Sequence, residues 1–258
     1  MTEYQNIPSS ALWQVENLRM TAIISPTDQV IEQNWWEEVV GNPPQNKIHQ
    51  PKVGIKQDQG SFGEGQLTLR IHPFGVDWLF GSIPNPFSSI FPSLGQFPEP
   101  LNPFIELINR WLENSPNLQR MAFGATLLLH CESLEKFYEE ISKYLFSSRF
   151  SFDNATQFNY TINRPRESTC SIPDLKINRL SVWSLVRLSK AQAAINPGIL
   201  NPGILSLPPS EISLAIRLQL DINTYPDFQG FLPPEKKDLI FEELIKLGQE
   251  IILKGDIQ

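Results

Sequence analysis

The sequence holds few of the side chains that usually make or break covalent bonds. It has three histidines and two cysteines in 258 residues, and only His130 and Cys131 are neighbours. A cysteine nucleophile needs an imidazole close to its thiolate and a donor for the developing oxyanion. Consecutive residues of a strand point to opposite faces, so these side chains are expected to lie apart if one strand continues through both. We therefore predict a structural role for this pair.

The other histidines are isolated. His49 lies in a polar, proline-flanked stretch and is predicted to be a solvated loop residue, whereas His72 ends a predicted strand and is expected to make a local hydrogen bond. Zinc sites need about four Cys or His ligands when closed and three when open. Because Cys170 has no CxxC partner, we predict neither a metal site nor a cofactor.

The usual phosphate-binding and catalytic motifs are missing. Gly60, Gly63 and Gly65 resemble a dinucleotide-binding loop only superficially, because their segment joins two predicted strands and does not open a helix. The sequence has no GxSxG, HExxH or kinase signature. These observations favour recognition over catalysis.

Arginines gather in one region of the second half of the chain. Arg164 and Arg166 are followed by Arg179 and Arg187. The rigid guanidinium fork suits a carboxylate, a phosphate or an acidic protein surface. If the flanking strands pair as a hairpin, Arg164 and Arg179 lie near one another. The four arginines form a candidate partner or anion site; the alternative is that Glu167 and nearby acids neutralise them on a solvated face.

Two adjacent tryptophans raise the question of an interface. Trp35 continues an apolar stripe with Ile31 and Val39, and Trp36 points about 100° away from it on a helix. An exposed tryptophan is a frequent interface anchor, so Trp36 is a candidate partner-binding residue. The alternative is a wide buried face against a large core.

The charge balance and the N-terminus restrict the location and the partners. With 28 acidic and 21 basic side chains the net charge is −7, which disfavours nucleic acid and anionic lipid because Lys and Arg bind both. No apolar run approaches the roughly 18 residues that cross a bilayer. The first residues lack the features of a signal peptide. We expect a cytoplasmic protein with reduced cysteines. We expect this protein to bind another protein or a second copy of itself, and not to bind a membrane.

Hydrophobic periodicity predicts an α+β protein. The predicted strands cover residues 15–24, 52–59, 66–72, 76–83, 120–129, 157–163, 176–188 and 212–222, and the predicted helices cover 30–40, 104–112, 134–145 and 236–253. Six prolines between residues 84 and 103 predict an irregular connector.

The order of elements starts again in the middle of the chain. Leu18-Arg19-Met20-Thr21-Ala22 precedes a helix with Trp-Trp-Glu-Glu, and Gln119-Arg120-Met121-Ala122-Phe123 precedes one with Phe-Tyr-Glu-Glu. We predict two similar halves, residues 1–116 and 117–258, each a mainly antiparallel sheet covered by helices, packed as one unit and derived from an internal duplication. A shorter repeat, Asn-Pro-Gly-Ile-Leu at 196–205, predicts a turn-rich surface loop, with a binding loop as the alternative.

The C-terminal part carries a resemblance to a known group of proteins. Leu218-Gln219-Leu220-Asp221-Ile222, the helix from Lys236 to Leu253 and the order of elements are similar to a sporadically distributed family of uncharacterised bacterial proteins of about this length. The resemblance implies no activity and no residue role. The family's patchy distribution implies a mobile or defence-related genetic context.

The observations together predict a non-enzymatic protein-binding or scaffold subunit of a bacterial cytoplasmic complex, associated with defence. One alternative is an RNA-binding or RNA-processing subunit with duplicated ferredoxin-like units, which needs a basic groove and usually a glycine-rich loop near the C-terminus. A second alternative is a hydrolase without metal that uses His130, Cys131 or paired acids.

Overall fold

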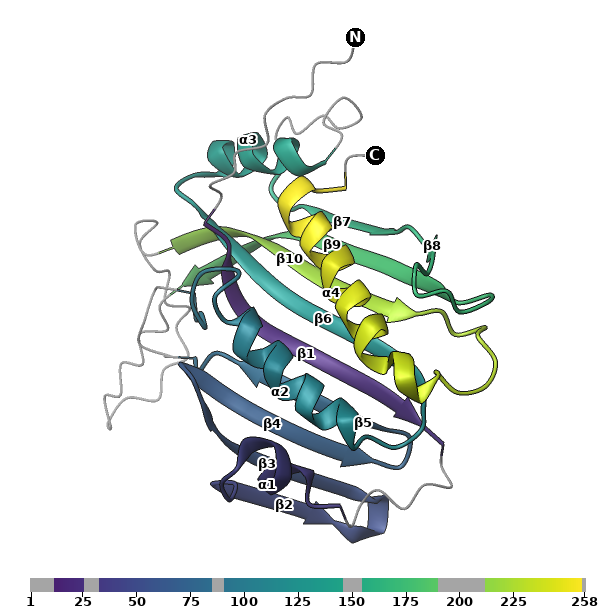
Figure 1. The fold of residues 1–258 in the computed structure, drawn as a ribbon. Helices are drawn as coiled ribbons and strands as arrows, with labels where there is room; N and C mark the ends of the chain where they lie inside the picture. The colour runs from purple at the N-terminus through teal and green to yellow at the C-terminus, as the bar shows by residue number, and fades with distance from the viewer. Residues whose placement is uncertain (1–11, 26–32, 85–90, 146–154, 190–211, 257–258) are drawn as a thin grey trace, which may run out of the picture.

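A computed structural model of the chain describes residues 12–25, 33–84, 91–145, 155–189 and 212–256 (Figure 1). Its strands are β1 (Gln14–Ile24), β2 (Asn46–Gln50), β3 (Ile55–Phe62), β4 (Gly65–His72), β5 (Gly75–Gly81), β6 (Leu118–Cys131), β7 (Asn159–Asn163), β8 (Arg166–Glu167), β9 (Lys176–Ser189) and β10 (Ile212–Thr224), and its α-helices are α1 (Trp35–Val40), α2 (Leu101–Glu113), α3 (Leu134–Tyr144) and α4 (Lys237–Lys254). The described strands make one antiparallel sheet of ten strands, in the order β2-β3-β4-β5-β1-β6-β10-β9-β7, with β8 paired to β9.

The two halves of the chain meet at the centre of this sheet. Each half begins with its central strand, and β1 pairs with β6 so that Met20 lies opposite Phe123 and Ala22 opposite Met121. The predicted boundary at residues 116 and 117 falls between α2 and β6. We predicted a sheet for each half; the strands form a single sheet instead, because the β1–β6 ladder joins the two.

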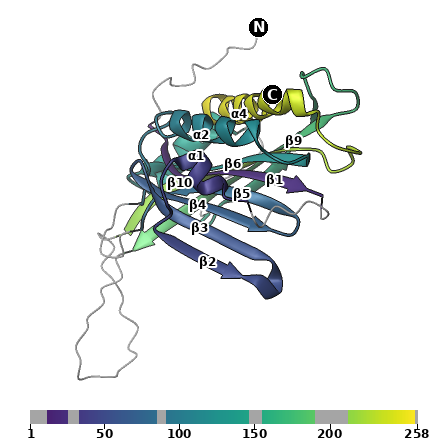
Figure 2. The ribbon, with the colours of Figure 1, turned by 60° about the horizontal axis from the view of Figure 1, so that its bottom comes forward.

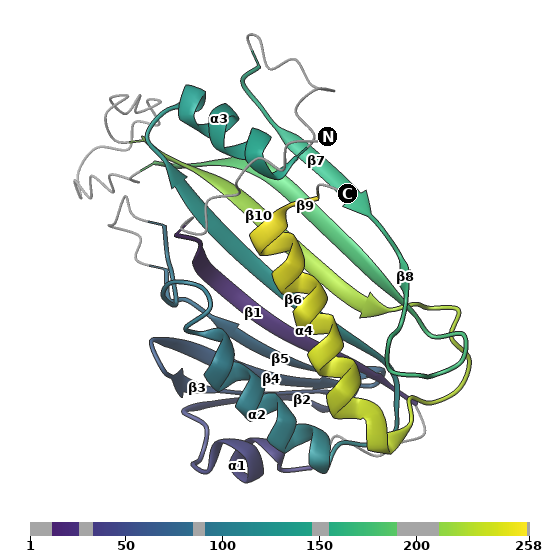
Figure 3. The ribbon, with the colours of Figure 1, turned by 45° about the horizontal axis from the view of Figure 1, so that its top comes forward.

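The described helices all lie on one face of the sheet (Figure 2). Strand side chains alternate between the two faces, and in β1 the residues on the helix side, Leu18, Met20, Ala22 and Ile24, are at most 1% exposed. Helix α4 crosses β6, β10 and β9 (Figure 3) and buries an apolar stripe on them. The hydrophobic core therefore lies in one layer between the sheet and the helices.

Four tryptophans fill this layer at the β1–β5 side. Trp35 packs edge-on against Trp111, which is also edge-on to Trp78, while Trp36 stacks on Trp78. Aromatic pairs of this geometry contribute about 0.5–1.5 kcal/mol each beyond their buried area. The short helix α1 is therefore held by its two tryptophans.

A buried lysine joins two helices. The Nζ of Lys237, at the start of α4, donates to the carbonyl and hydroxyl oxygens of Ser115 and to the carbonyl of Pro116, just beyond α2. Burial lowers the pKa of Lys237. These contacts tie the start of α4 to the segment that follows α2.

The α+β class and most of the predicted elements are confirmed. Strand β2 was not predicted, because all five of its side chains are exposed and it has no apolar alternation. Residues 26–32 and the repeat at 196–205 lie outside the described residues. Within the described part of the chain, no helix is both long and apolar enough to span a bilayer.

Candidate functional site: the uncovered face of the sheet

The sheet face opposite the helices carries polar side chains in rows that cross the strands. Register places Gln66 opposite Gly81, Gly81 opposite Asn17, Asn17 opposite Thr126 and Thr126 opposite Gln219. We call these five residues the polar row. Neighbouring strands are about 4.8 Å apart, so the row brings hydrogen-bonding groups from β4, β1, β6 and β10 into one line.

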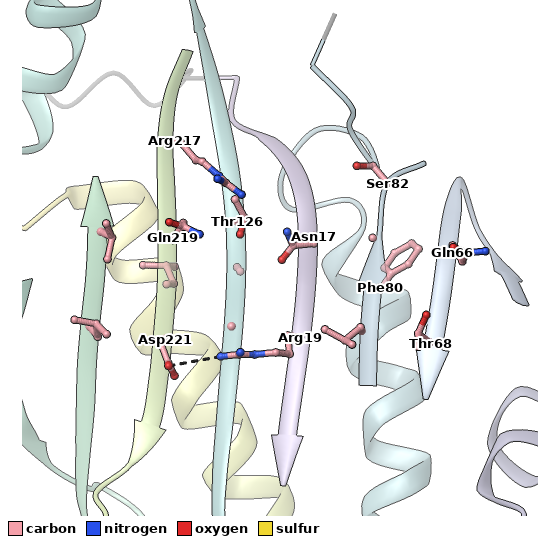
Figure 4. Close-up of a pocket in the computed structure, with 17 residues that line it drawn as sticks. Asn17, Arg19, Gln66, Thr68, Phe80, Ser82, Thr126, Arg217, Gln219 and Asp221 are labelled. Carbon is pink, nitrogen blue, oxygen red and sulfur yellow. Dashed lines mark ion pairs between the residues drawn. The ribbon is translucent and has the colours of Figure 1, made fainter. Parts of the chain in front are cut away.

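An ion pair crosses the central strand on one side of the polar row. Arg19 of β1 reaches over β6 to Asp221 of β10, with Nη2 3.6 Å from Oδ2 (Figure 4). Gly124 lies between them on β6. A Cβ at Gly124 would stand 3.0 Å from the Arg19 Nε and 3.2 Å from its Nη2, so glycine provides the room in which the guanidinium lies.

A second ion pair crosses the same strand in the opposite direction. The Nη2 of Arg217 on β10 is 3.0 Å from the Oε2 of Glu16 on β1. Glu16 sits at a register shift between Val15 and Asn17, a bulge that interrupts regular alternation and re-aims its side chain. We call Arg19–Asp221 and Arg217–Glu16 the cross-sheet ion pairs.

Thr126 lies on β6 between the two cross-sheet ion pairs and is 6% exposed. Among the described residues, the side chains of Thr126, Asn17, Gln66 and Gln219 make no hydrogen bond. Thr126 is buried, Asn17 and Gln66 are half-buried, and Gln219 is exposed. The middle of the face is therefore a set of hydrogen-bonding groups without an internal partner.

These side chains line a hollow of about 610 Å³, a size typical of ligand pockets. Its lining comes from β1, β4, β5, β6, β9 and β10 and includes the apolar Leu79, Leu180 and Val182. Both arginines face a carboxylate, so the charges in and beside the hollow cancel. No histidine or cysteine is among the described residues that line it. The arrangement is suited to binding a polar, uncharged group.

The structure brings three of the four predicted arginines together beside the C-terminal part of α4, where they pair with Glu250 and Asp256. The Nε and Nη2 of Arg164 lie 2.9 and 3.1 Å from the two carboxylate oxygens of Asp256, a bidentate pair that raises the pKa of Arg164. As predicted, Arg164 adjoins Arg179: its N–H donates to the Arg179 carbonyl. The alternative in which Glu167 neutralises these arginines was wrong for this residue, because Glu167 pairs with Lys176.

Glu250 of α4 forms ion pairs with the other two arginines of this group. It lies 3.4 Å from the Nη1 of Arg166 and 3.7 Å from the Nη2 of Arg179. Burial, and then the positive charge of Arg166, lower the pKa of Arg179, which is 5% exposed. We call Arg164, Arg166, Arg179, Glu250 and Asp256 the arginine cluster. Its ion pairs join β7–β9 to α4, and a role in binding a partner stays a prediction.

The remaining predicted site residues lie elsewhere. Arg187 is exposed at the far part of β9, where its Nη2 donates to the carbonyl of Thr156. Trp36 is 1% exposed, which contradicts an exposed anchor and fits the alternative of a wide buried face. The reason is that α1 packs Trp35 against α2 and Trp36 against β5, two directions about 100° apart.

The histidines and cysteines do not form a site. Strand β6 continues through His130 and Cys131, as expected, so His130 is exposed and Cys131 buried on opposite faces. Burial raises the pKa of the Cys131 thiol to about 11, which leaves almost no nucleophilic thiolate at neutral pH. In the described part of the chain no group of three His, Cys, Asp or Glu residues could hold a metal ion.

Of the predictions for the two other histidines, the one for His49 was wrong in part and the one for His72 is confirmed. His49 lies in strand β2, so its assignment to a loop is wrong, although it is exposed. His72 ends β4 and accepts a hydrogen bond at Nδ1 from the N–H of Phe74, which confirms the local bond.

Cys170 belongs to a clamp between α4 and the segment that joins β8 to β9. Glu243 accepts hydrogen bonds from the Ser168 hydroxyl, from the N–H and hydroxyl of Thr169, and from the thiol of Cys170. Burial alone would raise the pKa of Glu243, but these donors outweigh it and lower that pKa. Burial and the bond to Glu243 raise the pKa of Cys170 to about 11. The thiol therefore acts as a structural donor.

The polar row and the cross-sheet ion pairs were missed at the level of sequence. The signal is the alternation of polar with apolar residues in β1 and β10: Asn17, Arg19 and Thr21 on one, Arg217, Gln219 and Asp221 on the other. That pattern gives the face of each strand and leaves open which strands are neighbours.

Comparisons of the chain with protein-family models, with curated proteins and with solved structures find no match. The case for a function therefore rests on the geometry of the site.

Proposed function

We propose that this protein acts by binding another protein, and that the hollow on the uncovered face of its sheet is the binding surface. The observation that carries the proposal is the polar row. Three amide or hydroxyl side chains, Asn17, Thr126 and Gln219, meet on adjacent strands without a hydrogen bond to any described residue. These groups are free to hydrogen-bond to a bound molecule, and a typical hydrogen bond contributes about 0.5–1.5 kcal/mol net.

The positions of the reactive groups support a non-catalytic role. His49, His72 and His130 belong to β2, β4 and β6, and both thiols have pKa values raised to about 11. A hydrolase would need a base beside a nucleophile. The face offers donors and acceptors but no such pair among its described residues.

RNA is a weaker candidate for the hollow. Phosphates are bound by uncompensated Lys and Arg, whereas Arg19 and Arg217 each face a carboxylate. The bacterial and defence-associated setting is proposed from the resemblance alone, and the cytoplasmic location from the N-terminal sequence, the lack of a long apolar run and the two cysteines.

We also propose that the chain arose by duplication of one unit. Each half runs through a central strand, a helix, four further strands and a second helix: β1, α1, β2–β5, α2, and then β6, α3, β7–β10, α4. The central strands pair with each other, and the last strand of each half, β5 or β10, flanks its own central strand. This repeated order supports the proposal.

The binding role is tested by purification from the native host with variants of one face. The double variant N17A/Q219A removes two amides of the polar row; the control N102A/Q249A removes the same residue types from α2 and α4. Loss of two hydrogen bonds costs about 1–3 kcal/mol, or roughly fivefold to 150-fold in affinity. We expect quantitative mass spectrometry to find a stoichiometric partner with wild type and control, and a depleted one with N17A/Q219A.

Thermal unfolding of each variant verifies that the fold is kept. A partner retained equally by N17A/Q219A would remove the uncovered face from consideration. Light scattering separates self-association, in which the partner is a second copy, from binding of another protein.

A further inference from the structure

The two cross-sheet ion pairs and the polar row together form a slot that runs across the strands. Thr126, with Asn17 and Gln219 on either side, is its floor. Arg19–Asp221 crosses β6 at Gly124, and Arg217, opposite Leu128, reaches across β6 to Glu16. Figure 4 shows both guanidinium groups directed over β6, on the two sides of Thr126.

The width of the slot restricts what can lie in it. Arg19 and Arg217 start from register positions opposite Gly124 and Leu128, which are four residues apart on β6, or about 13 Å at roughly 3.3 Å per residue. An extended polypeptide occupies about 5 Å between hydrogen-bonded neighbours, which is less than this backbone spacing.

The chemistry of the floor matches a main-chain amide. Asn and Gln side chains each offer two donors and an acceptor, and a threonine hydroxyl offers a donor and two acceptors. A backbone N–H and C=O present the complementary groups at every residue. Leu79, Leu180 and Val182 line the same hollow and give apolar contacts to small side chains.

The charges of the slot argue against a charged ligand. The two arginines and the two carboxylates of the walls pair with each other, so an anion meets Asp221 and Glu16 and a cation meets Arg19 and Arg217. Burial of an unpaired charge beside either is unfavourable.

We infer that the slot binds an extended, uncharged segment of a partner polypeptide, whose main-chain amides hydrogen-bond to Asn17, Thr126 and Gln219. This inference rests on the proposed function and specifies the chemistry of the partner. The ligand segment is rich in small and amide side chains, and the cross-sheet ion pairs select against charge.

Selection from a library of random displayed peptides tests the inference with the full chain. Peptides are enriched on wild type and depleted on N17A/Q219A, and the most enriched peptide is then synthesised and titrated calorimetrically. We expect the enriched peptides to contain fewer Asp, Glu, Lys and Arg residues than the library. We also expect the dissociation constant of that peptide to rise about tenfold or more for N17A/Q219A and to stay unchanged for N102A/Q249A.

T126V provides a second variant whose fold is not in question, because valine has the shape of threonine without its hydroxyl. A several-fold weaker affinity of T126V for the selected peptide supports the inference. Enrichment of charged peptides, equal affinity of wild type and N17A/Q219A, or displacement of the peptide by oligouridylate would overturn it.

The two proposals can fail separately. If no peptide is enriched while N17A/Q219A still loses a protein partner from the native host, the inference is wrong and the proposed function stands. If the native partner is retained by N17A/Q219A, the proposed function itself is wrong.

Discussion

The arginine cluster and the cross-sheet ion pairs use the same residue types for different purposes. In the cluster, Asp256 and Arg179 are 8% and 5% exposed while the other three side chains are between 30% and 38% exposed, and the ion pairs lie between the sheet edge and α4. In the cross-sheet pairs the side chains are between 24% and 39% exposed and lie on a face that no described helix covers. Arginines that are close in sequence hold the fold together here, whereas two isolated ones shape the candidate site.

The largest expected effect on stability comes from Glu250→Ala in the arginine cluster. The substitution leaves the buried guanidinium of Arg179 with no ion-pair partner among the described residues, and breaking a buried pair costs about 3 kcal/mol. Urea denaturation should show that decrease in the free energy of unfolding at pH 7. A change below about 1 kcal/mol would contradict the structural role that we assign to the cluster.

An intermediate effect is expected for Glu243→Gln, and it should depend on pH. The substitution weakens the hydrogen bonds from Ser168, Thr169 and Cys170 and should cost about 2 kcal/mol at pH 7. The pKa of Glu243 in the folded protein lies below its ordinary value of 4.5, so its ionisation stabilises the fold above that pH. This stability is lost as the pH falls through the folded-state pKa.

Urea denaturation of wild type and E243Q between pH 7 and pH 3 measures this linkage. The difference in unfolding free energy should shrink as the pH falls below 4.5. A difference that is constant over the whole range would mean that the charge of Glu243 does not contribute.

The smallest effect on stability is expected for Arg19→Gln on the uncovered face. Both partners of the Arg19–Asp221 pair are more than one-third exposed and 3.6 Å apart, and exposed pairs contribute about 0–1 kcal/mol. The unfolding free energy of R19Q should therefore remain within about 1 kcal/mol of wild type. A decrease in unfolding free energy as large as that of E250A would mean that the Arg19–Asp221 pair stabilises the fold as the arginine cluster does. The difference between the two regions would then be lost.

Much of the fold could be predicted from the sequence, because strands and helices have distinct apolar periods. The continuous apolar run of β6 predicts a central strand, and the strand has β1 and β10 on its two sides. Strand β2 could not be found in this way, since an exposed edge strand such as Asn46–Gln50 has no buried side chain to mark its period.

The candidate site could not be predicted, because it depends on contacts between distant segments. Arg19 and Asp221 come from opposite ends of the chain and meet only when β1 and β10 flank β6. Arg164 looked available for the same reason: its partner, Asp256, comes from beyond α4. The prediction that Trp36 is exposed was wrong, because a six-residue helix can bury two of its faces when it lies between another helix and the sheet.

The pairing of β1 with β6 has a consequence for the order in which the slot is completed. Synthesis supplies Asn17 first, then Thr126 in the middle of the chain, and Arg217, Gln219 and Asp221 on the last strand. A nascent chain that has not yet emerged through β10 lacks one side of the floor and a member of each wall. The hollow is therefore complete only after β10 has been synthesised, and a chain truncated before β10 would lack Arg217, Gln219 and Asp221.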